Sequence, residues 1–137
     1  MPNEESFRKY QVQFQLIFKY PQGMRWTNDE YYIWTKEVAS GLGYDSYSGR
    51  GCFAFTMIAS DAAFGKIPVH EYKDRNKIKV GDILRINKDT HSVIVLKKLS
   101  KTKFKITEGN YNASINWGRI IDINETGFDY GLTKYKV

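Results

Sequence analysis

The spacing of the apolar residues changes once along the chain, near Val80, and this change limits the fold more than any other feature. Before it, residues 51–65 place apolar side chains at helical spacing. After it, apolar and polar residues alternate, which predicts short strands at residues 83–86, 91–96, 104–107 and 115–123. Helices followed by strands predict an α+β fold, in which N-terminal helices pack on a C-terminal antiparallel sheet.

Two helices are expected before the strands begin. Residues 27–30, Thr-Asn-Asp-Glu, have the spacing of a capping box and predict a helix that packs through Tyr31, Trp34 and Val38. Residues 51–65 predict a second, buried helix. Residues 7–20 fit either a strand or a helix, and residues 43–51 and 67–79 are expected to be loops.

The length and composition indicate one ordinary globular domain spanning residues 1–137. Apolar residues make up 42% and charged residues 26% of the chain, a balance that disfavours both disorder and membrane insertion. One cysteine and two histidines exclude an internal disulfide and a zinc site of ordinary ligand spacing, so neither a metal nor a cofactor is expected.

A formal net charge of +6 favours attraction to polyanions such as nucleic acid or an anionic cell-wall polymer. The lysines are scattered, and the sequence has no arginine-rich arm or aromatic ribonucleoprotein motif. We therefore expect a solvated basic surface and no nucleic-acid partner.

The single cysteine, Cys52, lies at the start of the predicted buried helix, directly after a glycine-rich stretch. Unpaired N–H groups and the positive end of the dipole at a helix N-terminus favour a thiolate over a thiol. A small apolar core residue is the alternative for any lone cysteine. A catalytic thiol also needs a base and a group that orients the base.

His91 is the better candidate for that base, because it opens an apolar strand directly after a polar turn, whereas His70 lies in a predicted loop. Glu108 and Asn110 follow the next strand and, in an extended chain, point to one face. A hairpin of these two strands brings His91 opposite the Glu108 region, so either residue could orient the imidazole.

These residues follow one another in a recognisable order: Cys52 at a helix start, Gly81-Asp82 before a strand, His-Ser-Val-Ile-Val at residues 91–95, and Glu-x-Asn at residues 108–110. The order resembles the cysteine, histidine-dependent amidohydrolase/peptidase (CHAP) family, which belongs with the NlpC-type peptidases in the papain-like superfamily. Its members are mostly bacterial and phage wall hydrolases that cut amide bonds in peptidoglycan peptides.

The resemblance covers residues 51–117 and implies a papain-like fold. It also implies Cys52 as the nucleophile, His91 as the base, and Glu108 and Asn110 as orienting residues.

The sequence departs from the family at the residue before the cysteine, where Gly51 replaces a glutamine whose side chain can help bind the oxyanion. The backbone N–H of Cys52 remains as one donor, and Tyr44 or Tyr47 could supply a second. Trp117 is a further candidate substrate contact. The acidic calcium-binding loop of some members is reduced to Asp45, so no calcium is expected.

The predicted function is amide hydrolysis through a thioester, with peptidoglycan peptides as the expected substrate. Two alternatives stay open: a peptidase or amidase that acts on other peptides, and a non-catalytic module that binds peptide or glycan on a papain-like frame. We expect a secreted or wall-associated protein whose leader lies outside this sequence, with a cytoplasmic location as the alternative. The oligomeric state is left open.

Overall fold

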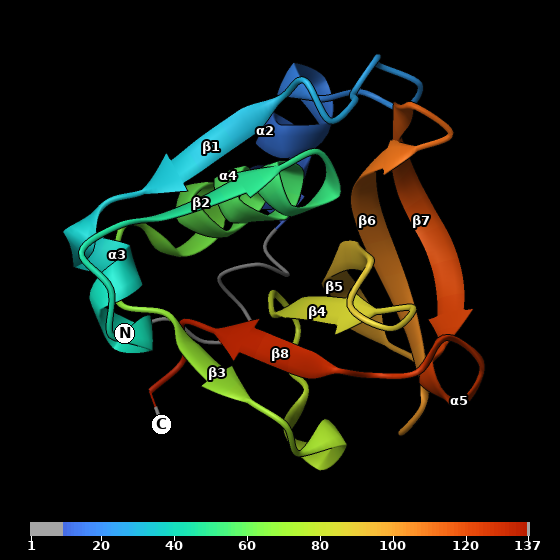
Figure 1. Cartoon of the computed structure of the whole chain (residues 1–137). Coiled ribbons are helices and arrows are strands. Elements are labelled where there is room, and N and C mark those ends of the chain that lie inside the picture. Colours follow the sequence, from blue (N-terminus) through green and yellow to red (C-terminus); the bar gives the residue numbers. More distant parts are fainter. Residues whose placement is uncertain (1–9, 137) are drawn as a thin grey trace.

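The computed structural model describes residues 10–136, with side chains from residue 15 onward, and it combines helices with two antiparallel sheets (Figure 1). The helices are α2 (Tyr10–Lys19), α3 (Lys36–Ala39), α4 (Cys52–Phe64) and α5 (Ile123–Thr126). The strands are β1 (Tyr31–Trp34), β2 (Tyr47–Arg50), β3 (His70–Tyr72), β4 (Ile83–Ile86), β5 (His91–Lys98), β6 (Lys103–Tyr111), β7 (Ser114–Asp122) and β8 (Tyr130–Thr133).

The larger sheet has six strands in the order β3-β8-β4-β5-β6-β7, and every neighbouring pair is antiparallel. The predicted C-terminal antiparallel sheet is thus confirmed. The predicted strands at residues 83–86, 91–96, 104–107 and 115–123 correspond to β4 to β7. The consecutive strands β4 to β7 are joined by short turns, so they lie side by side in chain order.

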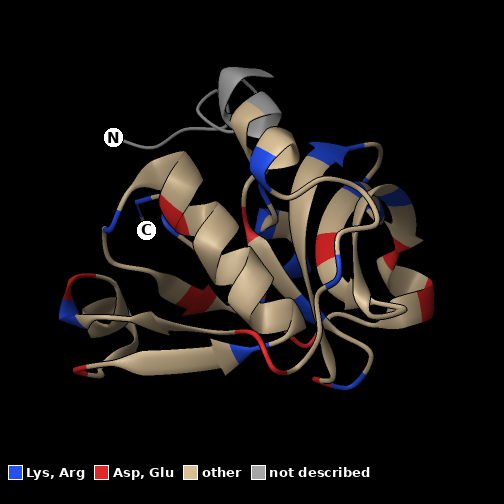
Figure 2. Cartoon of the chain, turned by 90° about the horizontal axis from the view of Figure 1, so that it is seen from above, with Lys and Arg blue, Asp and Glu red and all other residues tan. Residues whose placement is uncertain are grey.

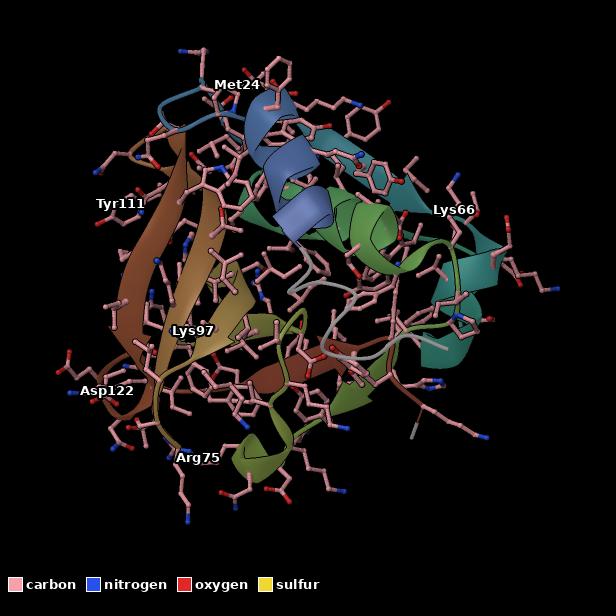
Figure 3. All side chains as sticks on the ribbon, turned by 180° about the vertical axis from the view of Figure 1, so that it is seen from behind. Met24, Lys66, Arg75, Lys97, Tyr111 and Asp122 are labelled. Atoms are coloured by element: carbon pink, nitrogen blue, oxygen red, sulfur yellow. The ribbon has the colours of Figure 1, made fainter. Side chains whose placement is uncertain are left out.

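The predicted buried helix is confirmed as α4, which packs between the β1–β2 pair and the six-stranded sheet (Figure 1). A helix that is apolar on all sides must be covered on all sides, and α4 carries one charged residue, Asp61. Helix α2 adds a further cover on α4 (Figure 3). Eight residues of α4 are buried: Cys52, Phe53, Ala54, Phe55, Thr56, Met57, Ala59 and Ser60.

The predicted helix over Tyr31, Trp34 and Val38 is wrong in its first half, because residues 31–34 form strand β1. The Thr27 side chain accepts from the backbone of Asp29, at 3.2 Å, which makes a local turn instead of a helix cap. The sequence Tyr-Tyr-Ile-Trp is rich in strand-favouring side chains, and it pairs with β2. A short helix, α3, follows only at Lys36–Ala39.

Two segments predicted as loops contain short strands. Strand β2 lies in the loop before Cys52, and β3 lies in the loop that follows α4 and pairs with β8. The undecided segment at residues 7–20 is helical from Tyr10 to Lys19, and residues 7–9 lie outside the described part. No helix within residues 10–136 is long and apolar enough to cross a membrane.

Candidate active site

Cys52 is the first residue of α4, and the helix start presents it to strand β5. Its side chain lies in hydrogen-bonding contact with the imidazole of His91 and with the backbone N–H of Ser92. Cys52 is buried, with 9% of the residue's surface accessible. The structure therefore brings Cys52 and His91 together.

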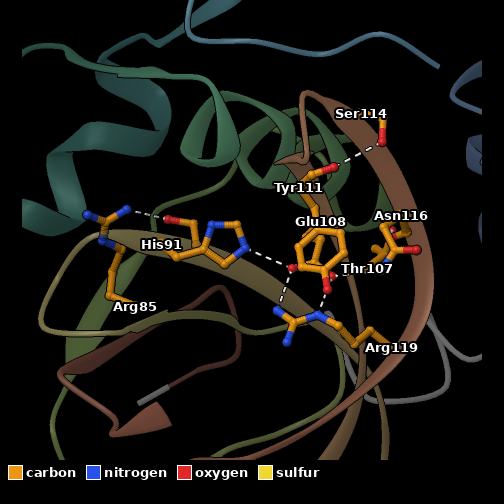
Figure 4. Close-up of polar contacts among 9 residues, drawn as sticks. Arg85, His91, Thr107, Glu108, Tyr111, Ser114, Asn116 and Arg119 are labelled. Carbon is orange, nitrogen blue, oxygen red and sulfur yellow. Dashed lines mark hydrogen bonds and ion pairs between the residues drawn. The ribbon is translucent and has the colours of Figure 1, made fainter. Parts of the chain in front are cut away.

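His91 opens β5, and its imidazole lies between the thiol and the next strand. The Nε2 atom is 2.8 Å from Oε1 of Glu108 on β6 (Figure 4). Because Nε2 is committed to the carboxylate, Nδ1 is the ring nitrogen left for the sulfur. Glu108 is therefore the residue that orients the imidazole.

Glu108 is completely buried and is bonded through both carboxylate oxygens. Arg119 on β7 donates from Nε to Oε2 at 2.8 Å and from Nη2 to Oε1 at 2.7 Å, a bidentate ion pair (Figure 4). Asn116 donates from Nδ2 to Oε2 at 2.9 Å. The carboxylate is thus held in one orientation by groups on two strands.

The contacts shift the pKa values of all three groups. Burial would raise the pKa of the Cys52 thiol, but the bonds from His91 and Ser92, with the charges of His91 and Arg85, lower it. Burial would lower the pKa of His91, but Cys52 and Glu108 raise it to about 9. Burial would raise the pKa of Glu108, but Arg119, His91 and Asn116 lower it to about 2. The group therefore favours a thiolate, an imidazolium and a carboxylate.

Arg85 on β4 adds a fixed positive charge near the sulfur. Its guanidinium carbon lies 5.7 Å from the ring centroid of Phe53, and Nη1 donates to Oγ of Ser92 at 2.7 Å. On the other side of the guanidinium, Nε of Arg85 donates to Oδ1 of Asp89 at 2.8 Å. Arg85 is thus positioned from two sides, and its charge favours the thiolate.

Asn110, predicted to share the orienting role, does not bond to His91 in the structure. Its backbone has a φ of 53°, so the residue leaves the strand geometry that would have pointed its side chain to the same face as Glu108. Its Nδ2 donates instead to Oδ1 of Asn28, at 3.0 Å.

Gly51 precedes the cysteine in a conformation that requires glycine, with φ 55° and ψ −120°. A Cβ atom at this position would lie 2.1 Å from Oδ1 of Asn28, a distance that no real Cβ adopts. The absence of a side chain at Gly51 therefore makes room for the side chain of Asn28.

Tyr44 and Tyr47 lie together, with stacked rings 5.6 Å apart and 21° between their planes. They line a pocket of about 600 Å³ beside the site, since the Tyr47 ring packs against Phe53, the residue after Cys52. The other residues of the pocket are Gly41, Leu42, His70, Glu71, Tyr130 and Leu132.

Trp117 is partly buried and packs against a small core cluster that contains Trp26 and Phe55, and its indole N–H donates to the carbonyl of Tyr20 at 2.8 Å. No contact of Trp117 with Cys52 or His91 is found among the described residues.

Arg119, Asn116, Arg85 and Asn28 are site residues that the sequence reasoning did not assign. The signal for the first two was weak, because residues 116 and 119 lie three apart in the predicted fourth strand and would point to opposite faces of a regular strand. The register between β6 and β7 shifts at a bulge, where Arg119 pairs with Ile106 but Asn116 pairs with Glu108.

Within residues 10–136, no three His, Cys, Asp or Glu side chains come together in a way that could hold a metal ion. Lys and Arg are distributed over many elements and are interleaved with Asp and Glu (Figure 2). The positive charge therefore does not gather on a single helix or strand.

Comparison with known proteins gives no match to any family model, to any curated protein or to any solved structure. The chemistry of the site therefore rests on its own geometry. A thiolate beside an imidazolium whose far nitrogen is bonded to a carboxylate can attack a carbonyl carbon and protonate the leaving group.

The reactivity of Cys52 should show this pairing directly. Its lowered pKa means that thiolate forms below the ordinary thiol value of 9.0, and the raised pKa of His91 keeps the imidazolium up to about pH 9. We expect alkylation by iodoacetamide, followed by mass spectrometry from pH 4 to 10, to rise in a step below pH 9. A single step at the ordinary thiol pKa would contradict the pairing.

Proposed function

We propose that the protein is a cysteine amidohydrolase or peptidase of papain-like architecture, which cleaves an amide bond in the peptides of bacterial peptidoglycan. The observation that carries the proposal is Cys52 at the start of α4, in contact with an imidazole whose Nε2 is 2.8 Å from buried Glu108. A thiol helix packed on an antiparallel sheet that carries the base and its carboxylate supports a papain-like arrangement.

The reaction follows from these three groups. The Cys52 thiolate attacks the carbonyl carbon, a C–S bond forms and the carbonyl oxygen becomes an oxyanion. When the oxyanion collapses, the C–N bond breaks and the His91 imidazolium gives its proton to the departing amine. Neutral His91 then takes a proton from water, which attacks the thioester and releases the acyl group as a carboxylic acid. Glu108 keeps the imidazole in one orientation throughout.

The pocket lined by Tyr44 and Tyr47, which adjoins Phe53, supports a peptide substrate. Its lining combines tyrosine rings with the carboxylate of Glu71, which suits a chain with both apolar and polar groups. The net charge of +6 favours approach to an anionic wall polymer, and salt should weaken that attraction. A peptidase acting on other peptides would use the same site.

A non-catalytic binding module is the second candidate. The enclosed Cys52, the oriented His91 and the fully buried Glu108 favour an enzyme, because binding a peptide or glycan requires none of them. Burying a carboxylate costs free energy even when it is paired, as Glu108 is with Arg119. Orienting the imidazole of His91 accounts for that cost in an enzyme, whereas a binding module has no use for it.

Digestion of purified bacterial peptidoglycan tests the proposal. We expect the protein to release fragments with new amine and carboxyl ends, identified by mass spectrometry, and we expect the Cys52→Ala variant to release none. Cleavage of a mixed peptide library but not of peptidoglycan would identify a peptidase with another substrate. No cleavage of either, together with an unreactive Cys52, would leave the binding module as the function.

A further inference from the structure

A second hollow lies on the opposite face of β8 from the pocket of Tyr44 and Tyr47. Strand β8 runs between β3 and β4 in the sheet, and alternate residues of a strand point to opposite faces (Figure 1). Tyr130 and Leu132 line the first pocket, Thr133 lines the second, and no lining residue is shared. The second hollow has a volume of about 360 Å³, and we call it the lysine pocket. It is lined by Tyr72, Lys77, Lys79, Thr133, Tyr135 and Lys136.

Half of the residues that line this pocket are lysines, and they come from two separate segments. Lys77 and Lys79 lie between β3 and β4, and Lys136 follows β8. None of the three makes an ion pair with a carboxylate among the described residues, whereas the buried Lys134 is paired with Asp61. Ammonium groups around one hollow repel one another, and a bound anion relieves that repulsion. The lysine pocket therefore favours an anionic ligand.

The two tyrosines of the lysine pocket contribute ring surface, because their hydroxyl groups are bonded inside the protein. The hydroxyl of Tyr72 donates to Oδ2 of Asp82 at 2.5 Å, and that of Tyr135 donates to the carbonyl of Val80 at 2.6 Å. Nζ of Lys79 lies 5.2 Å from the centroid of the Tyr135 ring. Apolar ring surface thus lies directly beside a positive charge.

Asp82, from the Gly81-Asp82 pair that the proposed reaction does not use, holds the walls of the lysine pocket together. It is buried, and its Oδ2 accepts from the backbone N–H of Lys79 at 3.1 Å as well as from the Tyr72 hydroxyl. The Tyr72 ring packs over Gly131, its partner on β8, where a side chain would collide with it. Burial raises the pKa of Asp82 to about 7, so the carboxyl is only partly ionised at neutral pH. The pocket is therefore held in shape with little opposing charge beneath it.

A phosphate monoester suits this combination of charge and ring surface. It carries a charge of about −1.5 to −2 at pH 7 and three acceptor oxygens, whereas a carboxylate carries a single charge. Lysine binds phosphate as a point charge, so ammonium groups from separate segments can surround one phosphate. A volume of about 360 Å³ accommodates a small molecule that carries the phosphate on a ring.

We propose that the lysine pocket binds a phosphate monoester carried on a ring, such as a sugar or aryl phosphate. Lys77, Lys79 and Lys136 hold the phosphate, and the rings of Tyr72 and Tyr135 hold the ring of the ligand. This inference goes beyond the proposed function and does not depend on it, since none of the lining residues belongs to the group around Cys52.

An NMR titration of isotope-labelled protein with phenyl phosphate and with glucose 6-phosphate tests the proposal. We expect saturating shifts of the backbone amides of Tyr72, Lys79 and Thr133 with at least one of these esters, and the tighter ester identifies the class of ring. Inorganic phosphate lacks a ring and should bind more weakly than that ester. Phenol and glucose lack the charge and should not bind.

Matched pairs of lysines separate the pocket from the general positive charge. Lys77→Gln combined with Lys79→Gln removes two ammonium groups but keeps the backbone N–H that Asp82 accepts, and we expect Kd to rise about tenfold or more. Lys101→Gln combined with Lys103→Gln makes the same change of charge at exposed residues outside the pocket and should alter Kd by less than about twofold. Lys136→Gln, a single change at an exposed residue, should raise Kd by about threefold or more.

Three results would contradict the proposal. The first is an absence of shifts with either ester at concentrations up to about 10 mM. The second is an equal rise of Kd in both lysine pairs, because the attraction would then be to the net charge. The third is saturating shifts at His91 and Ser92 in place of Thr133, because the phosphate would then lie at the thiolate pair. Equal affinity for inorganic phosphate and for both esters would overturn the assignment of a ring-bearing ligand.

Discussion

Replacing His91 by alanine is expected to lower amide hydrolysis by about 10⁴-fold or more, the largest loss of any substitution outside Cys52. The imidazole has two tasks at this site, to hold the sulfur as thiolate and to protonate the departing amine. Without it, burial is the dominant influence on Cys52 and raises the thiol pKa. The steady-state rate at which each protein releases fragments from peptidoglycan, measured at several pH values, checks this result.

The other histidine provides the matched control. His70 lines the pocket, so replacing it could change substrate binding. Alkylation of Cys52 is therefore the readout, because it does not depend on a bound substrate. We expect His91→Ala to slow alkylation near neutral pH by more than about tenfold, since little thiolate remains, and His70→Ala to leave the rate unchanged. Equal alkylation rates in both variants would remove His91 from the thiolate pair.

Replacing Glu108 by glutamine is expected to reduce both stability and activity. Glutamine keeps the size of the side chain but removes the charge that Arg119 and His91 share, and it can no longer accept both bonds from the guanidinium. Breaking a buried pair typically costs 3–5 kcal/mol, and Arg119 retains 28% of its exposure, so we expect a loss of about 3 kcal/mol. Urea unfolding at pH 7 measures it.

The pH dependence of that stability gives a second test. The pKa of Glu108 falls from 4.5 to about 2 on folding, so the charged carboxylate stabilises the fold above pH 4.5. This contribution is lost as the pH falls from about 4.5 to about 2. The free energy of unfolding of Glu108→Gln should therefore fall less than that of the unmodified protein as the pH is lowered from about 4.5 to about 2. Identical acid profiles in the two proteins would show that Glu108 is not ionised in the folded state.

The sequence predicted the positions of Cys52, His91 and Glu108 because each depends on short-range information. A helix start, a strand start and a hairpin determine where these three residues lie, and all three features leave local patterns in the sequence. The strand pattern also predicted β4 to β7, since these segments are short, rich in β-branched residues and bounded by turn residues.

The remaining site residues depend on departures from regular geometry, which alternation cannot reveal. The bulge beside Gly118, whose φ is 92°, brings both Asn116 and Arg119 to Glu108. The left-handed backbone of Asn110 turns its side chain to Asn28. Residues 31–34 were misassigned because Tyr31, Trp34 and Val38 fit helical spacing, whereas pairing with β2 makes residues 31–34 a strand.

The burial of α4 between two sheets has a consequence for how such a protein could diversify. The reactive groups sit on the best-covered elements, α4, β5 and β6, whereas the pocket draws on exposed side chains such as Tyr44 and Glu71 from short outer segments. Substitutions in those outer segments can alter which molecule is held without repacking the interior. Substrate preference can therefore be engineered, or can drift between relatives, independently of the chemistry.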